Sequence, residues 1–325
     1  MKLAIDVMGF ENDIIEPIKA CRKFKRQHQD VEFILVGNKD KIQSLIKPNE
    51  FIIHPANDVI KMDDNPMIAM RKTDSSMYQA IQLVQNNQAD GVLSAGSSSC
   101  YVPMSYLMLK LIDGINKPAF MPYVPTNNGK GFMLIDCGAN KECSGEDLYQ
   151  FAIMANIYCQ TIRHINKPTI GVINIGTEAE KGLSHHHTAN ELLKKDQSLN
   201  YIGFVEPRYL LNGSVDIAVC DGYTGNITLK ALEGGLSALK DSLKKEYKKP
   251  WNWLGAISSL FAIKALSKTF DYRNNAGAIV LGLQKVAIKT HGNADAQQFY
   301  SSIEMLYDVV KNKVVEQIKE SFNKH

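Results

Sequence analysis

The residues best suited to chemistry in this 325-residue chain lie between Val215 and Lys230, in the stretch VDIAVCDGYTGNITLK. The apolar run at 217–220 is typical of a parallel strand covered on both faces. The polar and glycine residues that follow it are Asp221, Gly222, Thr224, Gly225 and Asn226. Asn226 is a good N-cap for the helical spacing that resumes at Ile227. Ligands of open α/β sheets bind at the carboxyl ends of strands, and helix starts hold anions, so the stretch predicts an anion-binding crevice.

A second candidate loop follows the apolar run at 91–95. Gly96, Ser97 and Ser98 stand between this run and a helical segment expected from about Val102 to Ile112. A glycine followed by serines forms a polar nest for an anion, but serines in this place also cap helices. The residue pattern leaves both interpretations open.

Three further side chains follow expected strands or open expected helices. Either a helix that starts at Asn65 and Pro66 continues through Ser75, or Asp74 and Ser75 open a new helix that runs to about Gln88 and presents hydroxyls near a crevice. Asn140 belongs to a polar cluster after the expected strand that ends at Cys137. Lys181 lies six residues beyond another expected strand, where it either meets a phosphate or thioester oxyanion as a point charge or is simply solvated.

Metal binding has little support in the sequence. His185, His186 and His187 are consecutive, but successive residues point in different directions and no ligand set completes them. Cys137 and Cys143 have no second cysteine pair and no histidine at ligand spacing. We therefore do not expect a zinc site.

Composition places the chain among ordinary globular proteins, with 45% hydrophobic and 22% charged residues. The six cysteines mostly lie in apolar runs, and no secretory signal stands out, so a reducing cytosol is expected. The net charge of +3 is too small to indicate nucleic-acid binding.

Positive charge is concentrated in one part of the chain. Residues 240–273 contain eight basic and three acidic residues, so this part carries +5 and the remainder −2. Within it, the stretch at about 248–270 has an apolar helical stripe, both tryptophans and flanking lysines, and it is too short and too cationic to span a bilayer. A core helix would show a similar stripe. We expect contact with an anionic membrane surface through Trp251, Trp253, Leu254, Ile257 and Phe261.

The elements that position these residues repeat one pattern. Apolar runs end in glycine at Gly9, Gly37, Gly96, Gly138, Gly176 and Gly222, with helical segments between them. This is the signature of βαβ units and predicts an α/β fold with a mostly parallel sheet. Residues 118–125 are expected to be extended, 126–131 to form a hairpin turn, and Asp295 to Phe322 to form a long closing helix.

With these pieces in place, the chain resembles the phosphate acyltransferases of bacterial phospholipid synthesis, the PlsX type. Nearly the whole chain takes part, and the most specific block is Cys220-Asp221-Gly222 with Gly225-Asn226. Other matching blocks are Ala4-Ile5-Asp6 with Met8-Gly9, Asp74-Ser75-Ser76, Ser94-Ala95-Gly96, Asp136 with Gly138-Ala139-Asn140, Asn174-Ile175-Gly176 with Lys181-Gly182, and His291-Gly292.

The resemblance implies transfer of a long-chain acyl group from acyl carrier protein to inorganic phosphate, without metal, nucleotide or covalent acyl-enzyme. It implies one domain over residues 1–325 with a three-layer α/β/α architecture, similar to phosphate acetyltransferases and isopropylmalate-dehydrogenase-like enzymes. A cytoplasmic homodimer resting on the inner face of the membrane is expected. The site residues expected from the blocks are Lys181, Asn226 and His291 for catalysis, and Gly96, Ser97, Ser98, Asp221, Thr224, Gly225, Asn140 and Ser75 for binding phosphate and substrate.

The sequence departs from the family pattern in two loops. Phe10 and Glu11 follow Gly9 where another glycine and an aspartate are usual, and Ser97-Ser98-Ser99 replaces Asn-Thr-Gly. Ser99 loses the freedom of glycine at positive φ, which bears on the phosphate-binding geometry. Two alternatives remain open, a phosphate acetyltransferase that uses acetyl-CoA and a membrane-bound scaffold with weakened activity. A nicotinamide-dependent dehydrogenase is disfavoured because no G-x-G-x-x-G follows the first strand.

Overall fold

The computed structural model describes residues 1–249, 252, 259–271 and 275–323. Within these residues, one sheet of eleven strands has the order β3-β2-β1-β4-β11-β10-β5-β6-β9-β7-β8. Its strands are β1 (Lys2–Asp6), β2 (Glu32–Gly37), β3 (Ile52–Pro55), β4 (Gly91–Ser94), β5 (Ala119–Val124), β6 (Phe132–Ile135), β7 (Thr169–Ile173), β8 (Asn200–Val205), β9 (Ile217–Val219), β10 (Ala278–Leu281) and β11 (Val286–Lys289).

The sheet contains two parallel groups that run in opposite directions. The first group is β3, β2, β1, β4 and β11, and the second is β6, β9, β7 and β8. Between them, β10 is antiparallel to β11 and to β5, and β5 is antiparallel to β6. Three successive reversals leave the carboxyl ends of the two groups at opposite edges of the sheet.

Helices cover both faces of the sheet, as alternation along the strands requires. Leu3 and Ile5 of β1 belong to one hydrophobic cluster, whereas Ala4 belongs to another. The first face carries α1 (Ile15–Gln27), α6 (Gly145–Ile162), α7 (Ser184–Lys195), α11 (Ala296–Lys311) and α12 (Val314–Phe322). The second carries α3 (Pro66–Arg71), α4 (Ser76–Gln85), α5 (Ser98–Leu109) and the base of α8 (Gly222–Tyr247). The three-layer α/β/α expectation is confirmed.

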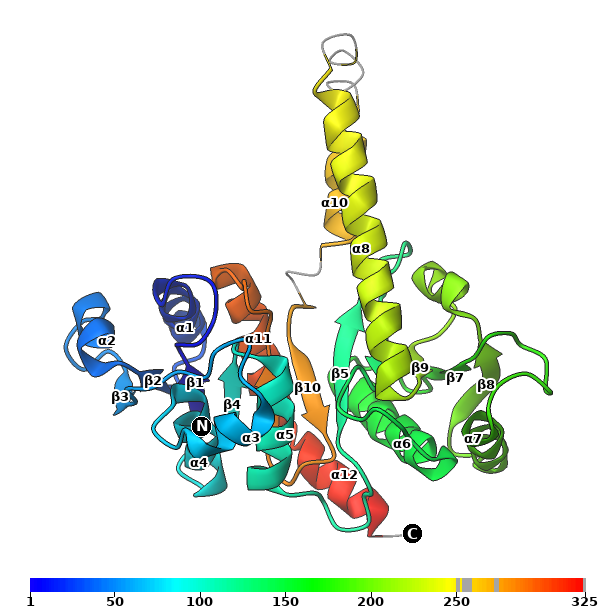
Figure 1. Ribbon diagram of the computed structural model, residues 1–325, viewed down its shortest axis with the longest axis horizontal. Coiled ribbons are helices and arrows are strands. Elements are labelled where there is room, and N and C mark those ends of the chain that lie inside the picture. Colours follow the sequence, from blue (N-terminus) through cyan, green and yellow to red (C-terminus); the bar gives the residue numbers. More distant parts are fainter. Residues whose placement is uncertain (250–251, 253–258, 272–274, 324–325) are drawn as a thin grey trace.

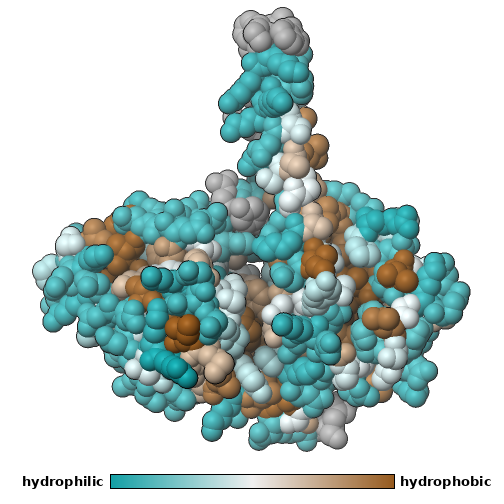
Figure 2. Space-filling view, in the orientation of Figure 1, coloured by the Kyte–Doolittle hydropathy of each residue, from teal (hydrophilic) through white to brown (hydrophobic). Residues whose placement is uncertain are grey.

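Two short helices complete the body: α2 (Lys39–Leu45) follows β2, and the 3-10 helix η1 (Pro207–Asn212) follows β8. From this body, the outer part of α8 projects far from the sheet, and α10 (Leu260–Thr269) lies behind it in the view of Figure 1. We call this pair the arm. Its surface is largely hydrophilic, with some hydrophobic residues along one side (Figure 2).

Three expected helix boundaries are wrong. The helix expected from Val102 begins at Ser98, so the serines form its first turn. Asp221, not Asn226, caps α8, because its carboxylate accepts the Thr224 N–H as soon as the strand ends. The expected closing helix breaks at Lys313, whose φ of 53° interrupts helical geometry between α11 and α12. The extended segment and hairpin turn between β5 and β6 are confirmed.

Candidate active site

Polar and charged residues at the ends of the strands form two groups. The first cluster follows β1, β4 and β11 and contains Asp6, Ser94, Gly96, Ser97, Ser98, Lys289 and His291. The second cluster follows β6, β7 and β9 and contains Asp136, Asn140, Lys181, His185, His186, Asp221, Thr224, Gly225 and Asn226.

A buried charged row underlies the first cluster. Asp6, Ser94 and Lys289 end three neighbouring strands, with Asp6 and Lys289 only 1% and 4% exposed. Ser94 donates to Asp6 at 2.7 Å and accepts the N–H of Gly96 at 3.0 Å, which fixes the loop. Burial raises the pKa of Asp6 to about 6 and lowers that of Lys289 to about 7. Lys289 could not be recognised from the sequence, since a lysine at a strand end is usually solvated.

The Gly96 loop is shaped by close packing rather than by positive φ. A Cβ on Gly96 would lie 2.4 Å from the Met77 side chain. Ser97 is buried, and its hydroxyl lies 2.8 Å from that of Ser99. Ser98 and Ser99 are exposed in the first turn of α5, so helical backbone, not left-handed backbone, is what position 99 needs.

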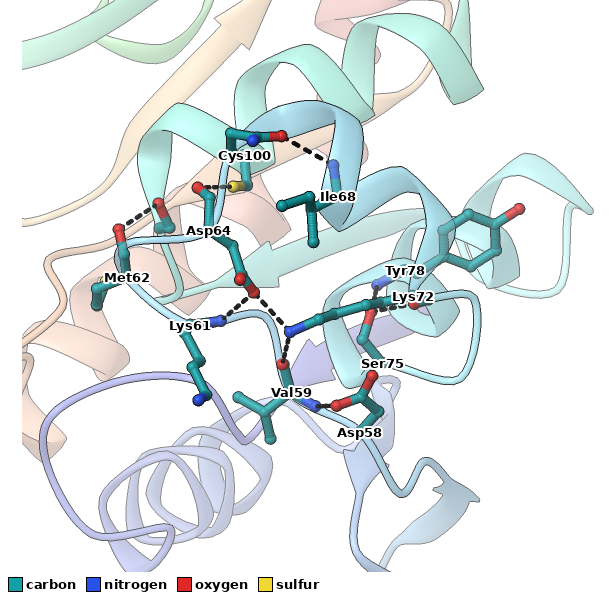
Figure 3. A network of polar contacts seen from close by, with 12 residues as sticks. Asp58, Val59, Lys61, Met62, Asp64, Ile68, Lys72, Ser75, Tyr78 and Cys100 are labelled. Carbon is teal, nitrogen blue, oxygen red and sulfur yellow. Dashed lines mark hydrogen bonds and ion pairs between the residues drawn. The ribbon is translucent and has the colours of Figure 1, made fainter.

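Ser75 serves its own helix. Its hydroxyl donates to the Lys72 carbonyl at 2.6 Å and accepts the Tyr78 N–H, so it is engaged as the N-cap of α4. The preceding loop is tied down by the Asp64–Lys72 ion pair at 2.6 Å and by Cys100, which donates to the Asp64 carbonyl (Figure 3). These contacts fasten the loop over the start of α5.

Asp136 organises the base of the second cluster. Its carboxylate accepts the N–H groups of Phe120, Ala139 and Asn140 and the Asn140 side-chain amide. Burial raises the pKa of Asp136 to about 6 despite these bonds. Asn140 also donates to the Pro118 carbonyl at 2.6 Å, so it holds the loop after β6 in place.

The start of α8 is pressed against this loop. A Cβ on Gly225 would lie 1.9 Å from the Asp136 carbonyl oxygen, which only glycine permits. Asp221 accepts from the Thr224 N–H at 2.9 Å and from its hydroxyl at 2.7 Å. Asn226 is exposed on the next turn, facing Gly138. Thr224 and Asn226 therefore both lie at the N-terminus of α8.

Lys181 lies in the loop between β7 and α7, four residues before His185. Its ammonium donates to Glu178 at 2.7 Å, and Asn174 donates to its carbonyl. The hydrogen bond with Glu178 raises the pKa of Lys181, so the side chain is cationic at neutral pH. Because His185 Nε2 is 4.0 Å from Asp221, this loop and the start of α8 belong to one neighbourhood.

The histidines do not fit a metal. A ring nitrogen of His185, one of His186 and a carboxylate oxygen of Asp221 lie within 4.8 Å of one another. However, His186 Nδ1 accepts the Leu183 N–H at 3.0 Å, which places the remaining proton of the neutral ring on Nε2. Neither nitrogen then offers a lone pair, and two ligands do not make a zinc site.

One helix connects the two clusters. Lys230 and Glu233, two to three turns along α8, form an ion pair at 3.0 Å. Burial lowers the pKa of His291, whereas nearby Glu233 raises it and Lys230 lowers it. The same two side chains act on buried Cys137 after β6. Lys230 and Glu233 belong to the sequence block after Gly225-Asn226 that carries the family resemblance, although they were not among the expected site residues.

The membrane-contact residues can be placed only in part. Trp251, Trp253, Leu254 and Ile257 lie outside the described residues, and Phe261 on α10 is 86% exposed. Among the described helices, none combines the length and apolar character needed to cross a bilayer.

Two solved structures have a similar fold. A phosphotransacetylase from Streptococcus pyogenes superposes with a TM-score of 0.64 over 97% of this chain and 94% of that one, at 16% identity. A branched-chain phosphotransacylase from Enterococcus faecalis gives 0.58 over 95% and 99%, also at 16% identity. The expected phosphate-acetyltransferase-like fold is confirmed.

Sequence relatives are much closer. Residues 1–317 match the family described as "Fatty acid synthesis protein". The phosphate acyltransferase of Malacoplasma penetrans is 52% identical over 100% of this chain and 98% of its own length. That of Mycoplasma genitalium is 45% identical over 100% and 98%. The chain therefore belongs to the fatty acid synthesis protein family, whose curated members at this similarity are named phosphate acyltransferases.

Proposed function

We propose that this protein is an acyltransferase that moves a long-chain acyl group from acyl carrier protein to inorganic phosphate, which feeds phospholipid synthesis. The observation that carries the proposal is the end-to-end match with a phosphate acyltransferase at 52% identity. The phosphotransacetylase and the branched-chain phosphotransacylase share only 16% identity with this chain, and such a low identity supports a common fold but not a common substrate. An acetyl-CoA-dependent activity is therefore not favoured.

The reaction needs little covalent help from the protein. A phosphate oxygen of hydrogen phosphate attacks the thioester carbonyl, the C–S bond breaks, and the proton of the phosphate ends on the leaving thiolate. Because the nucleophile is already an anion, the protein must chiefly hold it, remove its water and stabilise the oxyanion. Backbone N–H groups, amides, hydroxyls and a lysine are sufficient for these tasks.

We assign the phosphate and oxyanion to the second cluster. The N-terminus of α8 offers Thr224 and Asn226, and Lys181 supplies positive charge from the neighbouring loop. Gly96, Ser97, Ser98 and His291 of the first cluster form a further proposed binding element, linked to the second cluster by α8. Asn140 and Ser75 support these elements through their helix and loop contacts.

The arm is the proposed membrane-contacting part, and the molecule is proposed to work as a homodimer at the inner face of the membrane. Its exposed Phe261 and the lysines near its tip suit an anionic lipid surface. Contact there would keep the enzyme, and so its amphiphilic acyl phosphate product, close to the bilayer.

The decisive experiment incubates the protein with palmitoyl-acyl carrier protein, with and without phosphate, and traps acyl phosphate with hydroxylamine. We expect hydroxamate only when phosphate is present, and a rate loss of about tenfold or more, or about 1.4 kcal/mol, for Lys181→Ala and Asn226→Ala. Lys195→Ala, in the last turn of α7, is the matched control. Rates within about twofold of wild type for both site variants, under 1 kcal/mol, would remove these roles. Preference for acetyl-CoA would overturn the function.

A further inference from the structure

Asp6 is the centre of the buried hydrogen-bond network that underlies the first cluster. One oxygen of its carboxylate accepts the Met8 N–H at 3.1 Å, and the other accepts the Ser94 hydroxyl at 2.7 Å. The Ser76 hydroxyl, in the first turn of α4, is a further donor. A carboxylate can accept several hydrogen bonds at once, and these come from three different segments of the chain. Asp6 therefore joins the loop after β1, the end of β4 and the start of α4 at one point.

Ser94 connects Asp6 to the Gly96 loop (95–99). The Ser94 hydroxyl hydrogen is given to Asp6, while the same oxygen accepts the Gly96 N–H at 3.0 Å. The Ser94 carbonyl also accepts the Thr290 N–H at 3.0 Å. Because the Ser94 and Asp6 side chains are buried, solvent cannot replace a bond that is lost here. The start of the Gly96 loop is thus fixed through a single hydroxyl group.

Lys289 connects Asp6 to the His291 loop (290–293). Its ammonium donates to the Thr290 carbonyl, immediately before His291. Burial is the largest influence on the pKa of both Lys289 and Asp6, and the attraction between their opposite charges opposes it. A lone charge in such a place would be costly, so each of these two charges depends on the other. The position of the Lys289 ammonium is therefore coupled to Asp6.

The loops after β1, β4 and β11 also contact one another. The Glu11 N–H donates to the Gly292 carbonyl at 2.8 Å. A Cβ on Gly96 would lie 3.6 Å from the Gly9 carbonyl oxygen. The three loops therefore form one connected unit above the buried network.

We propose that Asp6 is a positioning residue that acts through Ser94 and Lys289 to hold the Gly96 and His291 loops in the geometry that binds substrate. The proposal rests on the proposed function, in which these loops form a binding element. Asp6 is buried and touches no substrate itself. A carboxylate suits this role because it only accepts. An amide in its place would donate to the Ser94 oxygen and compete with the Gly96 N–H.

Ser94→Ala cuts the connection to the Gly96 loop and leaves both charges in place. Because a loosened binding loop weakens ground-state binding, we expect the KM for acyl carrier protein thioester or for phosphate to rise by about three- to tenfold in the hydroxylamine assay. The kcat should stay within about twofold. A purely structural role would instead reduce the amount of folded enzyme, which lowers kcat and leaves both KM values unchanged.

Ser302→Ala is the matched control for the loss of a buried serine hydroxyl. Ser302 lies on α11, and its hydroxyl donates to the Gln298 carbonyl of the same helix. This variant should change neither KM.

Asp6→Asn cuts both connections, because it introduces a donor toward Ser94 and removes the charge opposite Lys289. We expect a larger rise in the same KM than Ser94→Ala produces. Asp147→Asn, in the first turn of α6, is the control for the loss of a buried carboxylate and should leave both KM values unchanged.

Hydrogen–deuterium exchange tests the positioning without any measurement of activity. In Ser94→Ala, the amides of residues 95–99 should exchange about tenfold faster than in wild type, and in Asp6→Asn those of residues 290–293 should follow. The amides of residues 138–142 and 222–228, in the second cluster, should stay within about twofold in both variants.

Three results would overturn the proposal: unchanged KM values for both substrates in Ser94→Ala, unchanged exchange at residues 95–99, or faster exchange of equal size in both clusters. If wild type forms no acyl phosphate, the proposed function fails instead. The exchange measurements then still decide whether Asp6 and Ser94 position the loops.

Discussion

At the carboxyl end of β11, the Lys289 ammonium donates to the neighbouring Thr290 carbonyl in a site that is closed to solvent. Desolvation is the main cause of its lowered pKa, and Asp6 offsets only part of it. Only the folded state buries this charge. The free energy of unfolding must therefore depend on pH through Lys289.

The folded and unfolded chains bind different numbers of protons at Lys289 over part of the pH range. Between the folded pKa of about 7 and the ordinary value of 10.5, the unfolded chain holds a proton on Lys289 that the folded chain lacks. The free energy of unfolding therefore rises with pH in this window, by at most about 1.4 kcal/mol per pH unit. Below it, both states are protonated and the contribution is constant.

Lys289→Met should flatten that rise. Urea denaturation of wild type and variant between about pH 7.5 and 9.5 measures it, with the surface variant Lys285→Met as control. If the wild-type and Lys289→Met curves run parallel, the buried lysine does not have the pKa assigned to it.

At the level of the elements, the packing of α8 against the loop after β6 depends on Gly225. Gly225→Ala would place a Cβ against the Asp136 backbone, and backbone atoms cannot yield as a flexible side chain can. We expect a loss of about 1 to 3 kcal/mol in the free energy of unfolding.

The same helix provides its control, since a Cβ on Gly234 would meet nothing within 4 Å. Gly234→Ala should stabilise by about 0.5 to 1 kcal/mol, because alanine loses less backbone entropy in a helix. Urea denaturation of both variants checks the pair. Equal effects would mean that Gly225 is not held by close packing.

The recurrence of strand and glycine was enough to predict the α/β class, because both features are local. The order and direction of the strands were not predictable in the same way. The reversal through β10 and β5 depends on pairing between residues 119–124 and 278–281, which are far apart in the chain.

The candidate site shows the same division. Thr224 and Asn226 could be assigned to the start of α8, although Asp221 proved to be the cap. The environment of His186 could not be predicted in this way. Its ring accepts a hydrogen bond from Leu183 and is buried, and only tertiary packing provides that burial.

At the scale of the whole molecule, the arm is the main departure from a compact body (Figure 1). Lys248→Glu and Lys249→Glu combined with Leu254→Glu should release the protein from anionic vesicles by about tenfold or more, since each basic residue near such a surface contributes about 1 kcal/mol. Sedimentation with anionic and uncharged vesicles measures this. Lys194→Glu with Lys195→Glu, on α7, is the control. Unchanged sedimentation of the triple variant would count against membrane contact through the arm.

The unbroken course of α8 has a mechanical consequence. Its 26 residues span about 39 Å, with the Asp221 cap at one end and the arm at the other. Such a rod acts as a lever whose fulcrum lies in the second cluster. A tilt of about 5° at the base would move the far end by about 3 Å, so whatever holds the tip also limits how Thr224 and Asn226 can shift.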